Sequence, residues 1–138
     1  MPLMQRNKGK RIERELAKFL TDLGFTASRG AQHRGGAGSP DIECNSLPYV
    51  HIECKGVAAM DLGTELLEQA LDQAEKDCSC TRKTPVVLWR PPRKSWRLSY
   101  RVSINESSKF YAVTVCGPEP IRESLLAIDN DGRTIYGH

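Results

Sequence analysis

The first strong pattern along the chain is an apolar stripe within residues 8–23. Its members recur at the spacing of one helix face, and they are Ile12, Leu16, Phe19, Leu20 and Leu23. Asn7 is a suitable N-cap for this helix, and Gly24 stands where a helix can end. The pattern predicts a helix over residues 8–23 that packs its apolar face on a core.

The next segments carry the shorter patterns that are typical of strands. Residues 24–30 predict a short strand, which leads into a glycine-rich loop at 31–40. Residues 41–45 and 49–56 predict two further strands. The turn residues between these two strands favour a hairpin.

Helical spacing returns in residues 61–78, where Asp61 or Thr64 can serve as the N-cap. The apolar stripe of this second predicted helix consists of Leu62, Leu66, Leu67, Ala70, Leu71, Ala74 and Cys78.

Three more strands and a closing helix complete the predicted elements. The strands are expected at 85–90, 95–103 and 109–117, and the helix at 121–128. The order α-β-β-β-α-β-β-β-α predicts an α/β fold in which a mixed β-sheet is flanked by helices. The length of 138 residues fits one domain over residues 1–138.

Trp96 and Tyr100 fall on one face of the strand predicted at 95–103, because side chains alternate along a strand. Aromatic side chains on one face can stack on unpaired bases. A place in the core is the commoner role for such residues, and it is the favoured interpretation here.

Charge is distributed unevenly along the chain, although the formal net charge is only +3. Residues 1–40 contain eight Lys and Arg against three Asp and Glu, and residues 82–101 contain seven basic residues and no acid. The segment 41–77 between them contains nine acids and two basic residues. Basic segments on both sides of an acidic centre suit a protein that binds phosphates around a metal, although solvated surface gives the same pattern.

Composition argues against a membrane or secreted protein. No apolar run approaches the ~20 residues of a membrane span, and the basic start of the chain lacks the apolar centre of a signal peptide. The odd count of five cysteines argues against a disulfide framework, and Cys78 and Cys80 lack the second pair that a structural zinc site needs. No membrane partner is expected, and the expected compartment is the cytoplasm, or the host cytoplasm for a viral protein.

The candidate chemical groups are Pro40-Asp41 and, after eleven intervening residues, Glu53-Cys54-Lys55. Strand alternation places Glu53 and Lys55 on one face, and the predicted hairpin brings Asp41 beside Glu53. Two carboxylates at one point suit Mg²⁺, which prefers oxygen ligands, and the backbone carbonyl of Cys54 can add another. Such an ion polarises a phosphate and activates water, and Lys55 can stabilise the developing charge, so the trio predicts phosphodiester hydrolysis. The alternative to a metal site is that Asp41 only occupies a turn after Pro40, and that Glu53 and Lys55 form a charge pair on the surface.

Glu13 follows Ile12, so it flanks the apolar stripe of the first predicted helix instead of lying opposite it. A carboxylate there can reach the metal-binding edge of the sheet and ligate an ion, or hold one of its waters. The alternative is a pair with a basic residue one turn away on an exposed helix face. The metal role is favoured, and Glu13 joins Asp41, Glu53 and Lys55 as an expected catalytic residue.

Four segments carry a resemblance to a known family. They are Gly9-Lys10-Arg11-Ile12-Glu13-Arg14-Glu15-Leu16, Arg29-Gly30, Ser39-Pro40-Asp41-Ile42 and His51-Ile52-Glu53-Cys54-Lys55-Gly56. With them the chain resembles the PD-(D/E)xK nuclease superfamily over residues 5–90, and it is most similar to the archaeal-type Holliday junction resolvases and their phage relatives. The resemblance implies a restriction-endonuclease-like fold, a divalent metal at Glu13, Asp41 and Glu53, a catalytic Lys55 and a homodimer.

The same resemblance implies further polar residues near the site. A serine close to the flexible loop supports the site in such resolvases, and Ser28 and Ser39 are the candidates. A polar residue on the following helix often faces the site in the superfamily, and Gln73 or Gln69 can take this place.

DNA contacts are expected mainly from basic residues on either side of the acidic centre. The expected DNA-binding residues are Lys8, Lys10, Arg11, Arg14, Arg29, Gln32, His33, Arg34, Ser39, Gln73, Arg90, Arg93 and Lys94. Few of them need to touch bases, so recognition of DNA shape is expected. No helix-turn-helix or zinc-finger pattern is present, which makes sequence-specific cutting the less favoured outcome.

The sequence therefore predicts a Mg²⁺-dependent endonuclease, with Mn²⁺ as a substitute, that resolves four-way DNA junctions as a homodimer. A less selective nuclease of the same superfamily, acting on single strands, flaps or ends in repair, recombination or restriction, is the alternative. A DNA-binding module with an inactive site is a third possibility, which the intact trio argues against.

Overall fold

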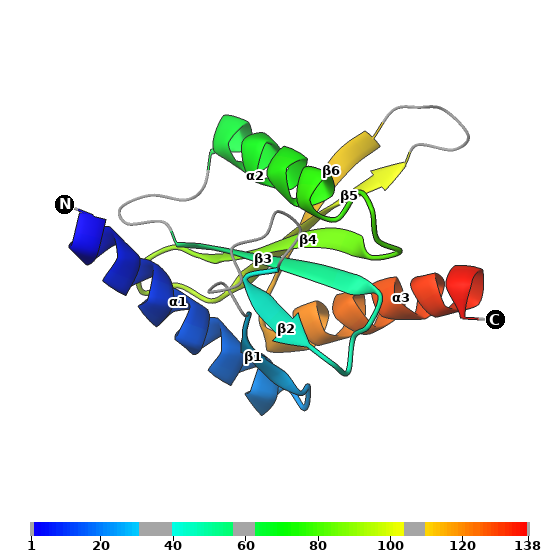
Figure 1. Ribbon diagram of the computed structural model, residues 1–138, viewed down its shortest axis with the longest axis horizontal. Coiled ribbons are helices and arrows are strands. Elements are labelled where there is room, and N and C mark those ends of the chain that lie inside the picture. Colours follow the sequence, from blue (N-terminus) through cyan, green and yellow to red (C-terminus); the bar gives the residue numbers. More distant parts are fainter. Residues whose placement is uncertain (1, 31–39, 57–62, 104–109, 138) are drawn as a thin grey trace.

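The computed structural model describes residues 2–30, 40–56, 63–103 and 110–137, without the side chains of residues 2–8 and 64 (Figure 1). The elements are α1 (Pro2–Asp22), β1 (Ala27–Arg29), β2 (Ile42–Cys44), β3 (Val50–Gly56), α2 (Thr64–Asp77), β4 (Thr84–Arg90), β5 (Arg97–Ser103), β6 (Phe110–Cys116) and α3 (Pro118–Tyr136). The predicted order of helices and strands is confirmed.

Six strands form one sheet, and their order across the sheet is their order along the chain. Neighbouring strands among the described residues run antiparallel, except for the parallel pair β3 and β4. A tight turn cannot join parallel strands, and α2 supplies the crossover between them. The predicted hairpin is present, with Ile42 of β2 opposite Ile52 of β3. The mixed sheet that the element order predicted is confirmed.

The helices cover both faces of the sheet, with α1 and α3 on one side and α2 on the other (Figure 1). The larger core lies under α1 and α3, where Leu16 and Leu125 are fully buried. The smaller core joins α2 to Val87 and Trp89 of β4. The sheet is therefore the middle of three layers.

Alternation along β3 decides which of its side chains meet which helices. Val50, Ile52 and Cys54 belong to the core under α1 and α3. His51 and Glu53 point to the opposite face, although both are buried as well. The polar residues of this central strand thus face the side of the sheet that α2 covers.

The first helix begins earlier than predicted and ends where predicted. Pro2 suits the first turn of a helix, because the N–H that it lacks would have no partner there. Asn7 therefore lies inside α1 and is not its N-cap. At the other end Gly24 has φ +101°, and the Phe25 N–H donates to the Leu20 carbonyl at 3.0 Å. This is the glycine-ended helix terminus expected at that position.

The second helix begins at Thr64, with Gly63 in the N-cap position and no side-chain cap hydrogen bond. Thr64 is thus the first helical residue and not the cap, and Asp61 and Leu62 lie outside the described residues. The predicted apolar stripe is correct for Leu67, Ala70, Leu71, Ala74 and Cys78, which are buried or half-buried. It is wrong for Leu66, which is 56% exposed because it projects about 100° around the helix from Leu67.

The last helix, α3, spans Pro118–Tyr136 and is much longer than the predicted 121–128. Contacts with the rest of the fold stabilise its second half, which is polar and contains a glycine. Asp129 is buried, accepts the Tyr49 backbone N–H at 2.9 Å and also accepts Arg133 Nε at 2.8 Å. Gly132 lies so close to Tyr49 that an added Cβ would be 2.4 Å from the tyrosine Cβ. The glycine thus permits close packing of α3 against Tyr49, in the turn before β3, and does not end the helix.

Trp96, which immediately precedes β5, and Tyr100 of β5 belong to the core. Trp96 is 4% exposed and stacks on Phe19 of α1, with ring centroids 6.0 Å apart. Tyr100 is half-buried and packs against the same cluster. The favoured interpretation of Trp96 and Tyr100 as core residues is confirmed, and Trp96 presents no surface on which a base could stack.

Within the described part of the chain, no helix has the length and apolar character needed to cross a bilayer.

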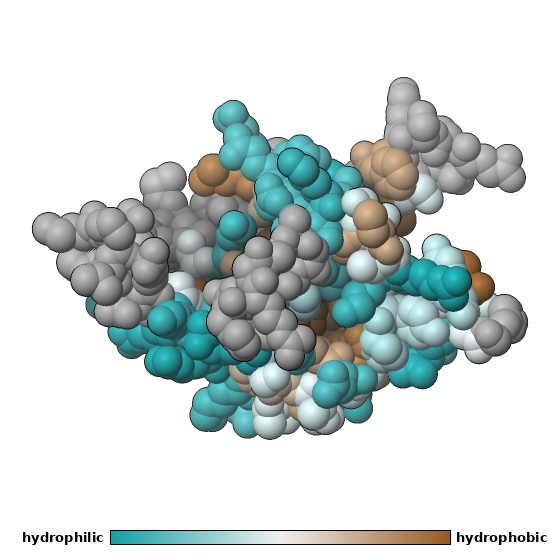
Figure 2. All heavy atoms as spheres, viewed as in Figure 1, coloured by the Kyte–Doolittle hydropathy of each residue, from teal (hydrophilic) through white to brown (hydrophobic). Residues whose placement is uncertain are grey.

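An arginine of the sheet binds α2 through ion pairs. Arg101 of β5 forms ion pairs with Glu68, with Asp72 at 2.8 Å and with Glu75 at 3.0 Å. Asp72 and Glu75 are exposed and Glu68 is half-buried. Hydrophilic residues gather over α2 on the face that Figure 2 shows. The hydrogen bonds of the three acids outweigh the opposing effect of burial and raise the pKa of Arg101 above its ordinary value. The helix that covers Glu53 is therefore held by charge as well as by apolar packing.

Candidate functional site

Asp41 and Glu53 meet where β2 begins beside β3. The Asp41 N–H donates to the Ile52 carbonyl at 3.2 Å, and Asp41 Oδ2 accepts the Cys54 N–H at 2.9 Å. The Asp41 side chain also shares a hydrogen bond with the Glu53 carboxyl. The hairpin thus brings the two carboxyls together, as the strand pattern predicted.

The contact between these carboxyls changes how each holds its proton. Burial and the hydrogen bond with Glu53 raise the pKa of Asp41 to about 7. Burial pushes the pKa of Glu53 upward too, but hydrogen bonds with His51 and Asp41 outweigh it and lower that pKa. As pH falls through about 7 the pair therefore takes up a proton on Asp41 while Glu53 keeps its negative charge.

Glu13 approaches the pair from α1. It is 7% exposed, accepts Arg29 Nε of β1 at 3.3 Å, and its charge contributes to the raised pKa of Asp41. The alternative that Glu13 makes a pair on an exposed helix face is wrong, because the side chain is buried and its partner lies on a strand. Three carboxyls from α1, β2 and β3 thus lie in one electrostatic neighbourhood.

Lys55 follows on the same strand. It is exposed and stands two residues after Glu53, so strand alternation sends both side chains to one face. The positive charge of Lys55 helps to lower the pKa of Glu53. Cys54 lies between them with its thiol in the core, where burial raises the pKa of that thiol and keeps it unreactive. The backbone of Cys54 remains beside Asp41.

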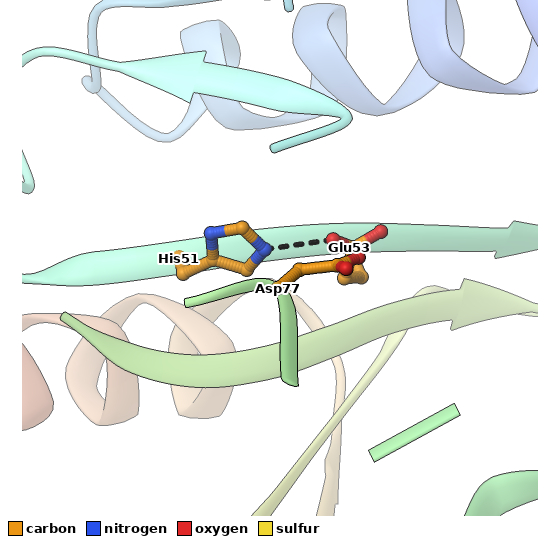
Figure 3. A group of neighbouring side chains, drawn as sticks. All are labelled: His51, Glu53 and Asp77. Carbon is orange, nitrogen blue, oxygen red and sulfur yellow. Dashed lines mark hydrogen bonds and ion pairs between the residues drawn. The ribbon is translucent and has the colours of Figure 1, made fainter. Parts of the chain in front are cut away.

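Two residues beside Glu53 escaped the sequence prediction. His51 Nε2 lies 2.7 Å from Glu53 Oε1, and Asp77, the last residue of α2, approaches the same carboxylate (Figure 3). Strand alternation could have found His51, since it stands two residues before Glu53. Asp77 could not be found in this way, because only the packing of α2 on the sheet brings it there. Gln73, one turn earlier on α2, donates to Asp77 Oδ1 at 2.8 Å.

The predicted DNA-binding residues of α1 lie mostly on its surface. Lys10, Arg11 and Arg14 are exposed, and Arg11 pairs with Glu15 at 3.3 Å. Lys8 lies in the same helix, although its side chain is not described. The predicted loop residues Gln32, His33, Arg34 and Ser39 lie outside the described residues.

The other predicted contacts divide into exposed and internally paired residues. Ser28, Gln69, Gln73, Arg93 and Lys94 are exposed. Arg29 is half-buried and pairs with Glu13. Arg90 pairs with Glu15 and lies 5.1 Å from the Trp96 ring centroid. Both arginines thus have carboxylate partners within the chain.

The turn after β4 lies close to the candidate site. Arg90 of β4 stands opposite Gly56 in the parallel pair, one residue beyond Lys55. Arg93 and Lys94 follow in the exposed turn between β4 and β5. The pair between Arg90 and Glu15 brings α1 to the same end of the sheet. The helix α1 and the basic turn after β4 thus both reach the end of the sheet where Lys55 stands.

A comparison with curated proteins gives no match. Among solved structures, the chain is similar to Hjc of Archaeoglobus fulgidus, a Holliday junction resolvase from an archaeal hyperthermophile. The two share 26% sequence identity and a TM-score of 0.48, and the match covers 77% of this chain and 83% of that chain.

A family model of archaeal Holliday junction resolvases (Hjc) matches residues 4–124. The match includes Glu13, Asp41, Glu53 and Lys55, and it extends past β6 into α3. Because it covers most of the chain, this protein belongs to the archaeal Holliday junction resolvase family, a family of nucleases that implies binding to branched DNA.

Proposed function

We propose that this protein is a Mg²⁺-dependent endonuclease that cuts opposed strands of four-way DNA junctions as a homodimer. The observation that carries the proposal is the contact between the Asp41 and Glu53 carboxyls at the start of the β2–β3 hairpin. Lys55 follows on the same strand face, and Glu13 approaches from α1. Carboxylates beside a lysine near the end of one strand suit phosphodiester hydrolysis.

The donor set fits a hard divalent cation. Glu13, Asp41, Glu53 and the backbone carbonyl of Cys54 would hold it, and all of them offer oxygen, which Mg²⁺ and Mn²⁺ prefer. The crowding of buried carboxyls raises the pKa of Asp41 to about 7, and a cation in place of the proton would relieve that crowding. When bound, the ion would polarise the scissile phosphate and lower the pKa of an attacking water.

The remaining residues have roles that do not depend on the ion. Lys55 is exposed beside Glu53, so its ammonium can stabilise negative charge that develops on the phosphate during attack. The exposed basic residues of α1 and of the turn after β4 can bind neighbouring phosphates. Such contacts position a duplex without reading its bases, which suits recognition of a branched shape.

A homodimer would explain how one small chain acts on a junction. A two-fold dimer presents two copies of the site, and a four-way junction offers two strands related by approximate two-fold symmetry. Family membership supports this assignment of substrate. Binding of the junction by one dimer then places each copy of Asp41 and Glu53 on its own strand.

The test is cleavage of a panel of four-way, flap, single-stranded and linear duplex DNAs with Mg²⁺, with Mn²⁺ and with EDTA. We expect paired nicks in the four-way junction that need Mg²⁺ or Mn²⁺, and dimer stoichiometry in the complex. Asp41→Asn should abolish cutting while junction binding persists. Cutting by that variant would refute the metal assignment, and equal cutting of linear duplex would replace the junction assignment with that of a less selective nuclease.

A further inference from the structure

His51 is deeply buried for a polar residue, with 1% of its surface exposed. Its Nε2 is bonded to Glu53 Oε1 at 2.7 Å, whereas its Nδ1 is buried without a hydrogen-bond partner among the described residues (Figure 3). A buried nitrogen without a partner costs stability, and an apolar side chain would fill the same space without that cost. The bond to Glu53 is therefore what the histidine adds at this position.

The direction of this hydrogen bond follows from the carboxylate. An ionised carboxylate only accepts hydrogen bonds, so His51 Nε2 carries the proton and donates it to Glu53 Oε1. His51 lies in the middle of the sheet, because β3 pairs with β2 on one side and β4 on the other. A donor fixed in the sheet thus restrains the rotation of the Glu53 carboxylate.

We propose that His51 is a positioning residue that sets how Glu53 presents its carboxylate, and thereby favours Mg²⁺ over Ca²⁺ at this site. The inference rests on the proposed function, in which Glu53 holds the metal. With Oε1 engaged by His51, Glu53 has its second oxygen for a cation that replaces the proton shared with Asp41. Binding through both oxygens would require Oε1 to share or give up its bond with the histidine.

This restraint acts differently on the two ions. Mg²⁺ demands near-ideal octahedral geometry, which single carboxylate oxygens satisfy, whereas Ca²⁺ has a more flexible shell and also takes carboxylates through both oxygens. A Glu53 carboxylate held by His51 therefore suits the smaller ion. Without the histidine, the carboxylate could turn and offer both oxygens, and the advantage of Mg²⁺ would shrink.

A competing possibility is that His51 binds an ion itself. One ligand atom from each of His51, Glu53 and Asp77 lies within 4.8 Å of the other two (Figure 3). The hydrogen bonds argue against it, since His51 Nε2 is engaged by Glu53 and Asp77 accepts Gln73. The positioning role uses these bonds as they stand, and the experiment separates the two roles.

The experiment measures metal binding by the free protein. Binding of Mn²⁺ is followed by the loss of its free electron paramagnetic resonance signal, and Mg²⁺ and Ca²⁺ are titrated as competitors. His51→Leu removes the donor and nearly keeps the volume, and His51→Gln keeps a donor. Ser99→Ala is the matched control, because Ser99 is a buried hydrogen-bonding residue of the same sheet that contacts Trp89 and Thr114 instead of Glu53.

We expect His51→Leu to weaken Mg²⁺ binding by about 10- to 100-fold, the usual effect of losing the partner of a metal ligand. Binding of Ca²⁺ should weaken less, so the preference for Mg²⁺ falls. His51→Gln should retain most of that preference, and Ser99→Ala should leave it unchanged. If His51→Leu binds Mg²⁺ and Ca²⁺ as tightly as the wild type, the proposal is overturned. It is also overturned if the wild type binds two Mn²⁺ ions and the variant loses one of them with the other unaffected, because His51 would then be a ligand itself.

A second measurement needs no variant and so does not depend on the folding of His51→Leu. Long-range ¹H–¹⁵N nuclear magnetic resonance of the wild type reports which ring nitrogen of His51 carries a proton. We expect Nε2 to stay protonated when Mg²⁺ saturates the site, and loss of that proton would overturn the positioning role. Failure of the proposed function looks different, because then the wild type binds no Mn²⁺ or Asp41→Asn binds it equally well.

Discussion

The Cys54 backbone N–H donates a 2.9 Å hydrogen bond to Asp41 Oδ2. Because Cys54 lies between Glu53 and Lys55, this bond fixes Asp41 relative to both. Asp41→Asn should keep the fold, since the oxygen of its amide can accept the same N–H. Asp41→Ala removes the acceptor, so its free energy of unfolding should be about 1 kcal/mol lower than that of Asp41→Asn.

The substitution Asp41→Asn should stabilise the protein when no metal is present. At pH 8 in EDTA the folded wild type must ionise Asp41 beside Glu53, whereas asparagine carries no charge. We expect Asp41→Asn to unfold at higher urea than the wild type, and the order to reverse when Mg²⁺ is added. A variant less stable than the wild type in EDTA would contradict the crowding of carboxyls at this point.

The stability of the metal-free wild type should fall as pH rises from about 4 to about 7. The pKa of Asp41 is raised from 3.8 to about 7, so in this window the folded chain holds a proton that the unfolded chain has lost. Stability is therefore greatest at the acid end of the window and is lost as pH rises through the folded pKa, by on the order of 2 kcal/mol for a proton shared with Glu53. Urea unfolding in EDTA at pH 5 and pH 8 measures it.

Glu53 should not add to this pH dependence. Its pKa is lowered, so its contribution to the free energy of unfolding is lost only as pH falls below the ordinary pKa of a glutamate, and it stays nearly constant between pH 5 and 8. Two variants provide the controls. Asp41→Asn should flatten the pH dependence in that interval. Asp22→Asn changes an exposed carboxyl that pairs with Lys18, and it should leave the dependence as it is in the wild type.

Arg90 and Arg93 lie three residues apart and should respond differently to substitution. Arg90 pairs with Glu15 and lies over Trp96, so Arg90→Ala should lower the free energy of unfolding by about 1–2 kcal/mol. Arg93 is exposed, so Arg93→Ala should instead weaken junction binding and reduce its salt dependence by about one counterion. Urea unfolding and binding titrations at several salt concentrations separate the two effects, and an Arg90→Ala variant of wild-type stability would contradict a stabilising role for Arg90.

Alanine at two helical glycines should act in opposite directions. Gly9 of α1 has room for a Cβ among the described residues, so Gly9→Ala should stabilise the protein by about 0.5–1 kcal/mol. Gly132 of α3 lies against Tyr49, so Gly132→Ala should destabilise it by about 1–3 kcal/mol despite the better helix propensity. Thermal unfolding of both variants provides the measurement, and stabilisation by Gly132→Ala would contradict the close packing of α3 against Tyr49.

The parts of the fold that were predictable depend on neighbours in sequence. Alternation along β3 placed Glu53 and Lys55 on one face, and Gly24 marked the end of α1. The same alternation could have added His51, had a polar residue in an apolar strand been read as a partner of Glu53.

The parts that were missed depend on contacts between distant segments. The length of α3 follows from the contact of Asp129 with Tyr49, 80 residues away in sequence. The partner of Arg90 is Glu15, 75 residues away, and the approach of Asp77 to Glu53 requires the crossover of α2. No local pattern encodes such pairs, so the sequence analysis gave Arg90 no partner within the chain and ended the last helix too early.

The mixed sheet has a consequence for the order in which the candidate site assembles during folding. Asp41 and Cys54 are 13 residues apart and are joined by adjacent antiparallel strands, so closing this contact requires only a short loop. The parallel pairing of β3 with β4 must wait until α2 has folded back across the sheet, and such non-local pairing is slow. The two carboxyls thus lie in the hairpin that can form first, while the helices that carry Glu13 and Asp77 dock onto it later.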